Sequence, residues 1–211
     1  MNIPDNSLST IIHRGGASGV TGSCHQLIVN SESSLLIDCG LFQGEDAQQD
    51  SFEQLTIGFD ISTVKALVIT HVHIDHVGRL PYLLAAGFNG PILCSKPSAK
   101  LLPLVIEDAL KIGFTRNTRL IEQFLQRVDE QLVPLDYAKW HTLEATSSLM
   151  IKVKLQRAGH ILGSSYVEVS LRETNSKRRE RLSRRQELMC WCLSQPMEIG
   201  CMRGVTKGRR Y

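Results

Sequence analysis

The hydrophobic residues of this 211-residue chain fall into short blocks that follow two different spacings. Short runs rich in Val, Ile and Leu, bounded by polar turn residues, predict β-strands. The predicted strands are 26–29, 34–38, 64–70, 91–95, 149–155 and 165–169. Longer stretches in which apolar residues recur every three or four positions predict helices. The predicted helices are 76–86, 98–113 and 117–128.

This order of elements, strands followed by strand–helix units and then strands again, suits an α/β fold. The arrangement fits an αββα sandwich, in which two stacked sheets carry helices outside and functional residues occupy loops at one rim. A hydrophobic content of 42% is enough to bury a core. No apolar run reaches the ~18 residues of a membrane span, and the first residues lack a signal-peptide pattern. We therefore expect no membrane partner and a cytoplasmic location.

The densest chemical motif follows the predicted strand 64–70. His71, His73, Asp75 and His76 lie within one short stretch where the strand gives way to a loop. Because side chains alternate along an extended chain, His71 and His73 point the same way. Two imidazoles can then hold one cation while Asp75 and His76 hold a second one nearby. Imidazole and carboxylate ligands suit zinc, and manganese or iron can also use them. The alternative is a polar loop that is histidine-rich by chance.

The motif His-x-His-x-Asp-His-x-Gly at 71–78 resembles the signature of the metallo-β-lactamase fold. Three further stretches resemble the β-CASP branch of that superfamily, which includes ribonuclease J and the endonuclease subunit that cleaves messenger RNA before polyadenylation. These stretches are 15–25, 36–44 and 158–164. The resemblance covers about residues 10–170 and implies a zinc-dependent nuclease.

Specific roles for the site residues follow from the resemblance. One zinc would be held by His71, His73 and His160, and a second by Asp75 and His76. Asp75 would also accept a proton during two-metal hydrolysis of an RNA phosphodiester. The family pattern continues with a bridging aspartate and a late histidine, but no Gly-Asp pair and no histidine follow His160. We therefore expect one tightly held zinc, with manganese as a substitute, and a weak second site.

The basic character of the chain is confined to its last 41 residues. Residues 1–170 contain 13 Lys and Arg against 17 Asp and Glu, whereas residues 171–211 contain 11 against 4. Three interpretations of this tail compete. It can be an RNA-binding segment, a metal knuckle built from Cys190, Cys192 and Cys201, or a segment translated out of frame.

Back-translation favours the third interpretation. When the codons of residues 189–202 are read from one base earlier, Val, Leu and Val are forced at the second to fourth positions and Gly at the tenth. The remaining codons permit Asp-Val-Leu-Val-Leu-Glu-Ser-Thr-Tyr-Gly-Asp-Arg-Leu-His, which resembles the β-CASP segment that follows the metal-binding core. We infer a frameshift between about residues 170 and 189, which makes 1–170 a partial metallo-β-lactamase-like domain and 171–211 a disordered, out-of-frame tail.

The expected fold is therefore an incomplete αββα sandwich that contains the N-terminal part of a β-CASP nuclease. RNA is the expected substrate of the intact parent, and truncation is expected to impair this chain. Two alternatives stay open, namely a non-catalytic zinc-binding remnant and a metallo-β-lactamase-fold hydrolase of thioesters or lactones. The stretch 158–163 favours the nuclease. Asp38 is expected to brace the metal loops, and His25 to be a hydrogen-bonded core histidine.

Overall fold

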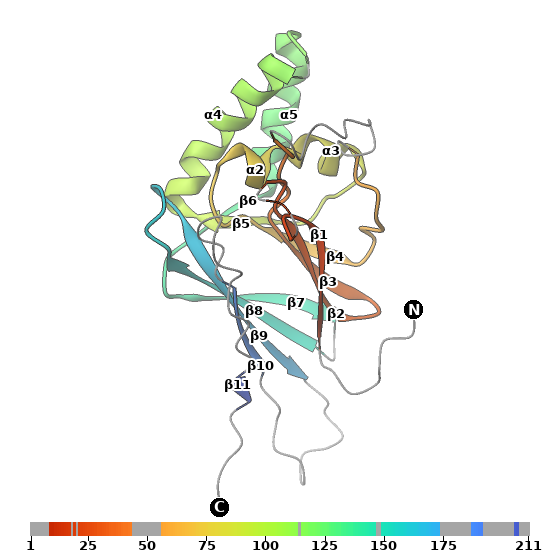
Figure 1. The fold of residues 1–211 in the computed structure, drawn as a ribbon, viewed down its shortest axis with the longest axis vertical. Helices are drawn as coiled ribbons and strands as arrows, with labels where there is room; N and C mark the ends of the chain where they lie inside the picture. The colour runs from red at the N-terminus through yellow and green to blue at the C-terminus, as the bar shows by residue number, and fades with distance from the viewer. Residues whose placement is uncertain are drawn as a thin grey trace, which may run out of the picture.

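Two stacked β-sheets form the centre of the molecule, and helices pack on the outer face of the first sheet (Figure 1). The computed structural model describes residues 9–17, 19, 21–43, 56–113, 115–146, 149–173, 187–191 and 205–206. This arrangement is an α/β sandwich with two stacked sheets, as the order of elements predicts. Among the described residues, no helix combines the length and apolar character needed to cross a bilayer.

The first sheet has six strands whose spatial order equals their order in the chain. The first and second strands pair antiparallel, as do the second and third. The third to sixth strands pair parallel, so the third strand joins the two parts of the sheet. The strands are β1 (Thr10–Gly15), β2 (Cys24–Asn30), β3 (Ser33–Ile37), β4 (Val64–Val68), β5 (Ile92–Ser95) and β6 (Leu132–Leu135). Because β3 to β6 run parallel, their carboxyl ends meet at one edge of the sheet, where binding sites of open α/β sheets form.

The second sheet is antiparallel throughout and also keeps the order of the chain. Its strands are β7 (Trp140–Thr146), β8 (Leu149–Arg157), β9 (Ser165–Glu173), β10 (Glu187–Trp191) and β11 (Val205–Thr206). In β8 every second residue is buried, which is the period expected when one face of a sheet covers a core.

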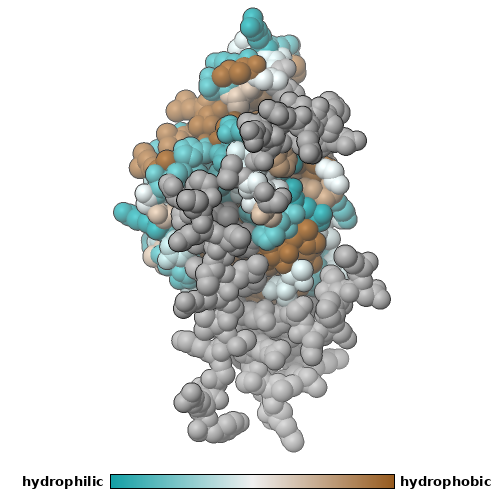
Figure 2. All heavy atoms as spheres, viewed as in Figure 1, coloured by the Kyte–Doolittle hydropathy of each residue, from teal (hydrophilic) through white to brown (hydrophobic). Residues whose placement is uncertain are grey.

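Four described helices lie against the first sheet. They are α2 (Ile74–Val77), α3 (Leu80–Ala85), α4 (Lys96–Gly113) and α5 (Thr118–Gln131). Asn117 caps α5, because its side-chain oxygen accepts hydrogen bonds from the backbone nitrogens of Arg119 and Leu120. Figure 2 shows hydrophobic and hydrophilic residues interspersed over the α4–α5 pair, a mixture normal for a protein surface.

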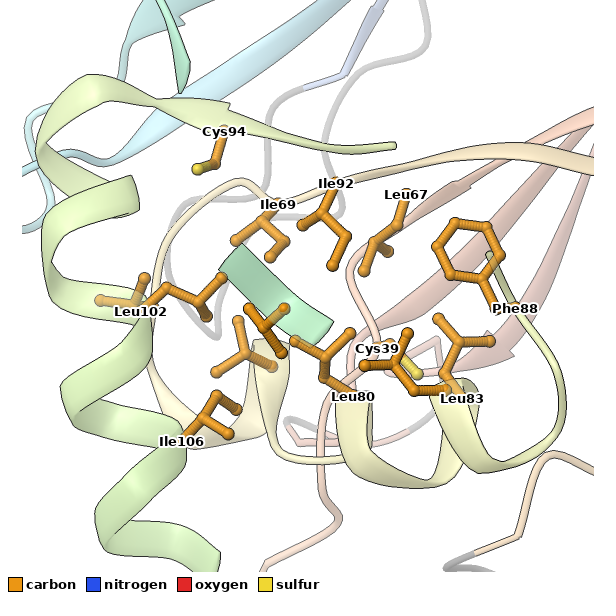
Figure 3. Close-up of a cluster of buried hydrophobic side chains, with 14 of the residues drawn as sticks. Cys39, Leu67, Ile69, Leu80, Leu83, Phe88, Ile92, Cys94, Leu102 and Ile106 are labelled. Atoms are coloured by element: carbon orange, nitrogen blue, oxygen red, sulfur yellow. The ribbon is translucent and has the colours of Figure 1, made fainter. Parts of the chain in front are cut away.

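Both faces of the first sheet are buried, so its central strands contribute to two hydrophobic cores. Within β3, Leu35 and Ile37 pack in the core between the sheets, whereas Leu36 packs in the core under the helices. Figure 3 shows the helix-side core, in which Leu102 of α4 lies among side chains from the strands and from α3. These two cores fix the strand ends from which the site residues project.

Some predicted element boundaries were wrong. The single helix predicted over 76–86 is two short helices, because the backbone nitrogen of Arg79 bonds to the Cys39 carbonyl and its side chain to the Gly40 carbonyl. The strand predicted to end at Thr70 ends at Val68, and the backbone nitrogen of Thr70 instead bonds to the Asp38 carboxylate.

The disordered, out-of-frame tail from residue 171 onward stays a prediction, and the structure describes only short parts of this segment. Strand β9 continues to Glu173, and β10 pairs with it from Glu187 opposite Leu171 to Trp191 opposite Val167. The physical reason is that an edge strand offers unpaired backbone groups, which another extended segment satisfies. The basic run at 177–185 and the cysteines at 192 and 201 lie outside the described residues.

Candidate metal centre

The histidines of the candidate site converge at the carboxyl-end edge of the first sheet. Thr70 and His71 follow β4, and Asp38 follows β3. The connection from β8 to β9, residues 158–164, brings His160 to the same edge. The backbone nitrogen of Ser165 bonds to the Thr70 carbonyl at 2.9 Å, which joins this connection to the end of β4. Residues far apart in the chain therefore meet here.

Three imidazoles form a compact group. The distance from His73 Nδ1 is 3.2 Å to His71 Nε2 and 3.3 Å to His160 Nε2. All three ligand atoms lie within 4.8 Å of one another. A tetrahedral zinc ion with bonds of about 2.0–2.1 Å places two ligand nitrogens about 3.3 Å apart, so the two separations made by His73 Nδ1 fit this metal. His71 is buried and the other two side chains are exposed, which leaves one side of the group open.

The tautomer of His71 follows from its hydrogen bonds. The Thr70 hydroxyl donates its proton to Asp38 Oδ2 at 2.8 Å, because a carboxylate can only accept. His71 Nδ1 lies 3.0 Å from the same hydroxyl and must therefore carry a proton and donate it. The lone pair is then on Nε2, the atom that faces His73. Burial and the neighbouring His76 lower the pKa of His71 to about 3, which keeps the ring neutral and able to bind a metal.

Asp38 organises the buried side of the site. Its side chain is 0% exposed, and its φ of 59° lies in the left-handed region that aspartate tolerates better than most residues. Oδ1 accepts from the Thr70 backbone nitrogen, and Oδ2 accepts from His76 Nδ1, each at 2.8 Å. Burial raises the pKa of Asp38, but the facing His76 and these hydrogen bonds outweigh burial and lower it. Asp38 is therefore a carboxylate that braces the metal loops.

Asp75 and His76 lie beside the three-histidine group. The His76 ring packs against the His71 ring with centroids 3.9 Å apart and the ring planes tilted by 46°, and its Nε2 lies 3.5 Å from Asp75 Oδ2. Burial lowers the pKa of His76, but Asp38 and Asp75 outweigh this effect and raise it. With Nδ1 donating to Asp38, His76 Nε2 is the ring atom that faces Asp75. Asp75 and His76 therefore place one carboxylate oxygen and one imidazole nitrogen side by side next to the three-histidine group.

The short helix α2 that carries Asp75 is held in place by backbone contacts. Ser23 nitrogen bonds to the Asp75 carbonyl at 2.9 Å, and Cys39 nitrogen bonds to the His76 carbonyl at 2.8 Å. Gly40 permits this approach, because a Cβ there would lie 1.5 Å from the Asp75 carbonyl oxygen. The position of Asp75 therefore depends on the loop after β3 as much as on its own helix.

The sequence analysis missed several residues that support the site. Thr70 bridges Asp38 and His71, as described above. Ser95 and Ser98 bond to the carbonyl of Gly163 in the connection that carries His160. Serine and threonine occur throughout the chain, so no sequence pattern marks these residues as supports.

His25 is a buried histidine, as expected. His25 Nε2 lies 3.1 Å from Ser23 Oγ, and its Nδ1 lies 2.8 Å from His13 Nδ1. Burial lowers the pKa of His25 to about 4. His25 is therefore a neutral, hydrogen-bonded side chain next to the Asp38 network.

Residues 22–173 match the family model described as the metallo-beta-lactamase superfamily, and this match includes all five candidate ligands. The chain belongs to the metallo-β-lactamase superfamily. Members of this superfamily bind divalent metal ions, which agrees with the three-histidine group.

Relatives of this metallo-β-lactamase chain are named as RNA-processing proteins. It is 36% identical to Ribonuclease TTHA0252 of Thermus thermophilus over 74% of the chain and 34% of the relative. It is 30% identical to the transcription termination factor FttA of Methanosarcina mazei over 72% of the chain and 23% of the relative. It is 28% identical to Endoribonuclease YSH1 of Gibberella zeae over 76% of the chain and 19% of the relative.

These relatives are β-CASP nucleases, so the predicted family is confirmed. The chain spans about a third or less of the length of each relative.

Proposed function

We propose that this chain holds one zinc ion through His71, His73 and His160 and that its chemistry is the hydrolysis of RNA phosphodiesters. The observation that carries the proposal is the convergence of three imidazole nitrogens at separations of 3.2 and 3.3 Å. Three imidazoles with an open fourth side are the ligand set of a catalytic zinc site. The names of the relatives support RNA as the substrate class.

A second metal position would use Asp75 and His76 and would be weaker, because these residues supply two ligand atoms where the first position has three. Manganese is a substitute at either position, since imidazole and carboxylate ligands suit both metals. When bound, the metal supplies Lewis acidity, which makes water a nucleophile near neutral pH and offsets the charge of a phosphodiester.

The protein residues would orient the reaction. The side chain of Asp75 is 22% exposed beside the histidines, so its carboxylate is placed to accept a proton from the attacking water. Asp38 fixes the tautomer of His76 directly and that of His71 through the Thr70 hydroxyl. Such supporting contacts keep ligands in one orientation before the metal and the substrate arrive.

Zinc titration of protein stripped with a chelator tests the metal assignment. We expect one tightly bound zinc and a second, much weaker one. His73→Ala should remove most of the tight binding, because His73 Nδ1 lies within 3.3 Å of both other ligand nitrogens. His141→Ala is the matched control, since His141 lies in β7 opposite Val153 of the second sheet. Two tightly bound zinc ions would contradict the weak second site, and no tight zinc would contradict the first.

Cleavage of a short labelled RNA with added zinc or manganese tests the substrate class. The chain is compared with a version whose reading frame is restored after residue 170, and we expect the restored version to be much faster. Asp75→Ala should abolish the activity of the restored version, which excludes a contaminating nuclease. Equal rates for both versions would contradict the expected impairment. Cleavage of a thioester but not of RNA would overturn the proposed substrate.

A further inference from the structure

The connection that carries His160, residues 158–164, is closed by hydrogen bonds to its own Ser164. Ser164 Oγ accepts from the backbone nitrogens of His160 at 3.0 Å and Ile161 at 3.2 Å. The Ser164 nitrogen bonds to the Ile161 carbonyl at 3.0 Å, and the Ala158 nitrogen bonds to the Ser164 carbonyl at 3.2 Å. The connection therefore behaves as one compact unit, and whatever holds Ser164 and its neighbour Gly163 also holds His160.

Two buried serines of the first sheet and its helix layer hold this unit. Ser95 is the last residue of β5 and Ser98 lies in the first turn of α4, and both are 0% exposed. Ser95 Oγ donates to the Gly163 carbonyl at 2.6 Å, and Ser98 Oγ donates to the same oxygen at 3.0 Å. Ser95 Oγ in turn accepts from the Ser98 backbone nitrogen at 3.2 Å. Ser95 Oγ also lies 3.1 Å from Ser98 Oγ, so the two hydroxyls and the Gly163 carbonyl form one hydrogen-bonded group.

Gly163 is shaped for this contact in two ways. Its φ of +91° lies in a region that side chains other than glycine rarely adopt. A Cβ at this position would also lie 2.5 Å from Ser98 Oγ and 2.7 Å from the Ser98 backbone nitrogen. The close approach of the connection to the start of α4 thus requires glycine, which indicates that the serine contact is a specific feature of the fold.

The exposed position of His160 makes such an anchor necessary. Side chains packed around a ring can fix a buried ligand such as His71, whereas an exposed ligand depends more on the backbone that carries it. The connection is tied at one end to Thr70 through Ser165, at 2.9 Å, and Tyr137 Oη donates to the Ser164 carbonyl at 3.3 Å. The two serine hydroxyls complete the attachment on the side of α4.

We infer that Ser95 and Ser98 are positioning residues for the metal centre, because they hold the Gly163 carbonyl and so place His160 against His71 and His73. This inference rests on the proposed metal centre. It assigns a role to the junction of β5 and α4, which contributes no metal ligand of its own.

Zinc affinity of the Ser95→Ala/Ser98→Ala variant, measured by competition with a chelating dye, tests the inference. We expect about a 10-fold loss of affinity, the lower end of the range for residues that orient metal ligands. Ser34→Ala is the matched control. Ser34 is also a buried strand serine, but its hydroxyl bonds to Gln26 at 3.1 Å and Thr63 at 3.0 Å. Unfolding of all variants is measured with chelator present, so that a change in stability is separated from a change in metal binding.

A second comparison tests whether the serines act on zinc binding through the position of His160 or only through the stability of the fold. If the serines act through His160, then adding Ser98→Ala to His160→Ala should cause no further loss of zinc affinity. The single variant Ser98→Thr should retain affinity, because it keeps the hydroxyl. If the double serine variant binds zinc as tightly as the wild type while His160→Ala binds weakly, the inference is overturned. An equal loss in Ser34→Ala would also overturn it. If His160→Ala itself keeps full affinity, the proposed metal centre fails instead.

Discussion

Replacement of Asp38 by asparagine probes the network that underlies the metal site. Asparagine has nearly the same shape as aspartate, and it tolerates the left-handed φ of 59° at this position. The substitution therefore changes the charge and the hydrogen bonding while the backbone stays as it is. We expect Asp38→Asn to destabilise the metal-free protein and to weaken zinc binding.

The size of the effect follows from the contacts of the carboxylate. Asp38 accepts three hydrogen bonds of 2.8 Å, from the Thr70 nitrogen, the Thr70 hydroxyl and His76 Nδ1. An amide has one oxygen, so its NH₂ group must face at least one of these donors. Removing one partner of a buried charged pair costs about 3–5 kcal/mol. Because the amide keeps part of the acceptor function, we expect a loss of about 2–4 kcal/mol in the free energy of unfolding.

The pH dependence has a defined sign. The pKa of Asp38 is lowered from its ordinary value of 3.8, so its stabilisation is present above that value and is lost as pH falls through the folded pKa. The pKa of His76 is raised from 6.5, so its stabilisation is present below 6.5 and is lost as pH rises through the folded pKa. The difference between wild type and Asp38→Asn should therefore be largest between pH 3.8 and 6.5.

Urea unfolding in the presence of a chelator, repeated across this pH range and above it, measures the effect. Asp60→Asn is the control, because Asp60 is exposed and bonds locally to Ser62 at 2.8 and 2.9 Å. We expect this control to change stability much less than Asp38→Asn. If the loss in Asp38→Asn is no larger than in the control, or does not change with pH, the assigned network is wrong.

Two further substitutions test the packing that places the site. Gly40→Ala should prevent correct folding, because the added Cβ would lie 1.5 Å from the Asp75 carbonyl oxygen; Gly58→Ala, with no atom within 4 Å of its Cβ, should leave the circular dichroism spectrum and the melting temperature nearly unchanged. Leu102→Ala should cost about 2–5 kcal/mol in urea unfolding because Leu102 is fully buried in α4, whereas Leu104→Ala, at a position 63% exposed, should cost far less, and equal costs would contradict the assigned core.

The central strands could be predicted from the sequence because they are buried on both faces. Strands β3, β4 and β5 each contain three consecutive apolar residues, a pattern typical of parallel strands covered on both sides. Strands β1 and β6 lie at the edges of the sheet, where polar residues and Pro134 are tolerated, so their patterns were not predictive. Such strands form because a neighbouring strand offers backbone partners, a property of the fold and not of the local sequence.

The residues of the candidate site were also predictable only in part from the sequence. His71, His73 and His160 were predicted because each lies in a short motif that resembles a known family. The roles of Thr70 and of the Ser95–Ser98 pair were not predicted, since they depend on contacts between segments far apart in the chain. Thr70 supports the site because its hydroxyl meets the His71 ring, and Ser95 does so because its hydroxyl meets the Gly163 carbonyl. Only the tertiary structure specifies these partners.

The reading-frame hypothesis stays a prediction. β10 occupies the place beside β9, and the codons of residues 189–191, read from one base earlier, permit Asp-Val-Leu. Both versions of this segment contain residues that form strands readily. Sequencing the DNA across codons 165–215 would decide the question.

In both sheets the spatial order of the strands repeats their order in the chain, and this has a consequence for how the protein acquires its site. Each strand can pair with the one made just before it, so the sheets can grow while the chain leaves the ribosome. The site needs more distant partners, because His160 meets His73 across 87 positions and its connection meets Ser95 across 68. The third imidazole therefore arrives last during synthesis, and metal capture would mark the moment when the two sheets have come together.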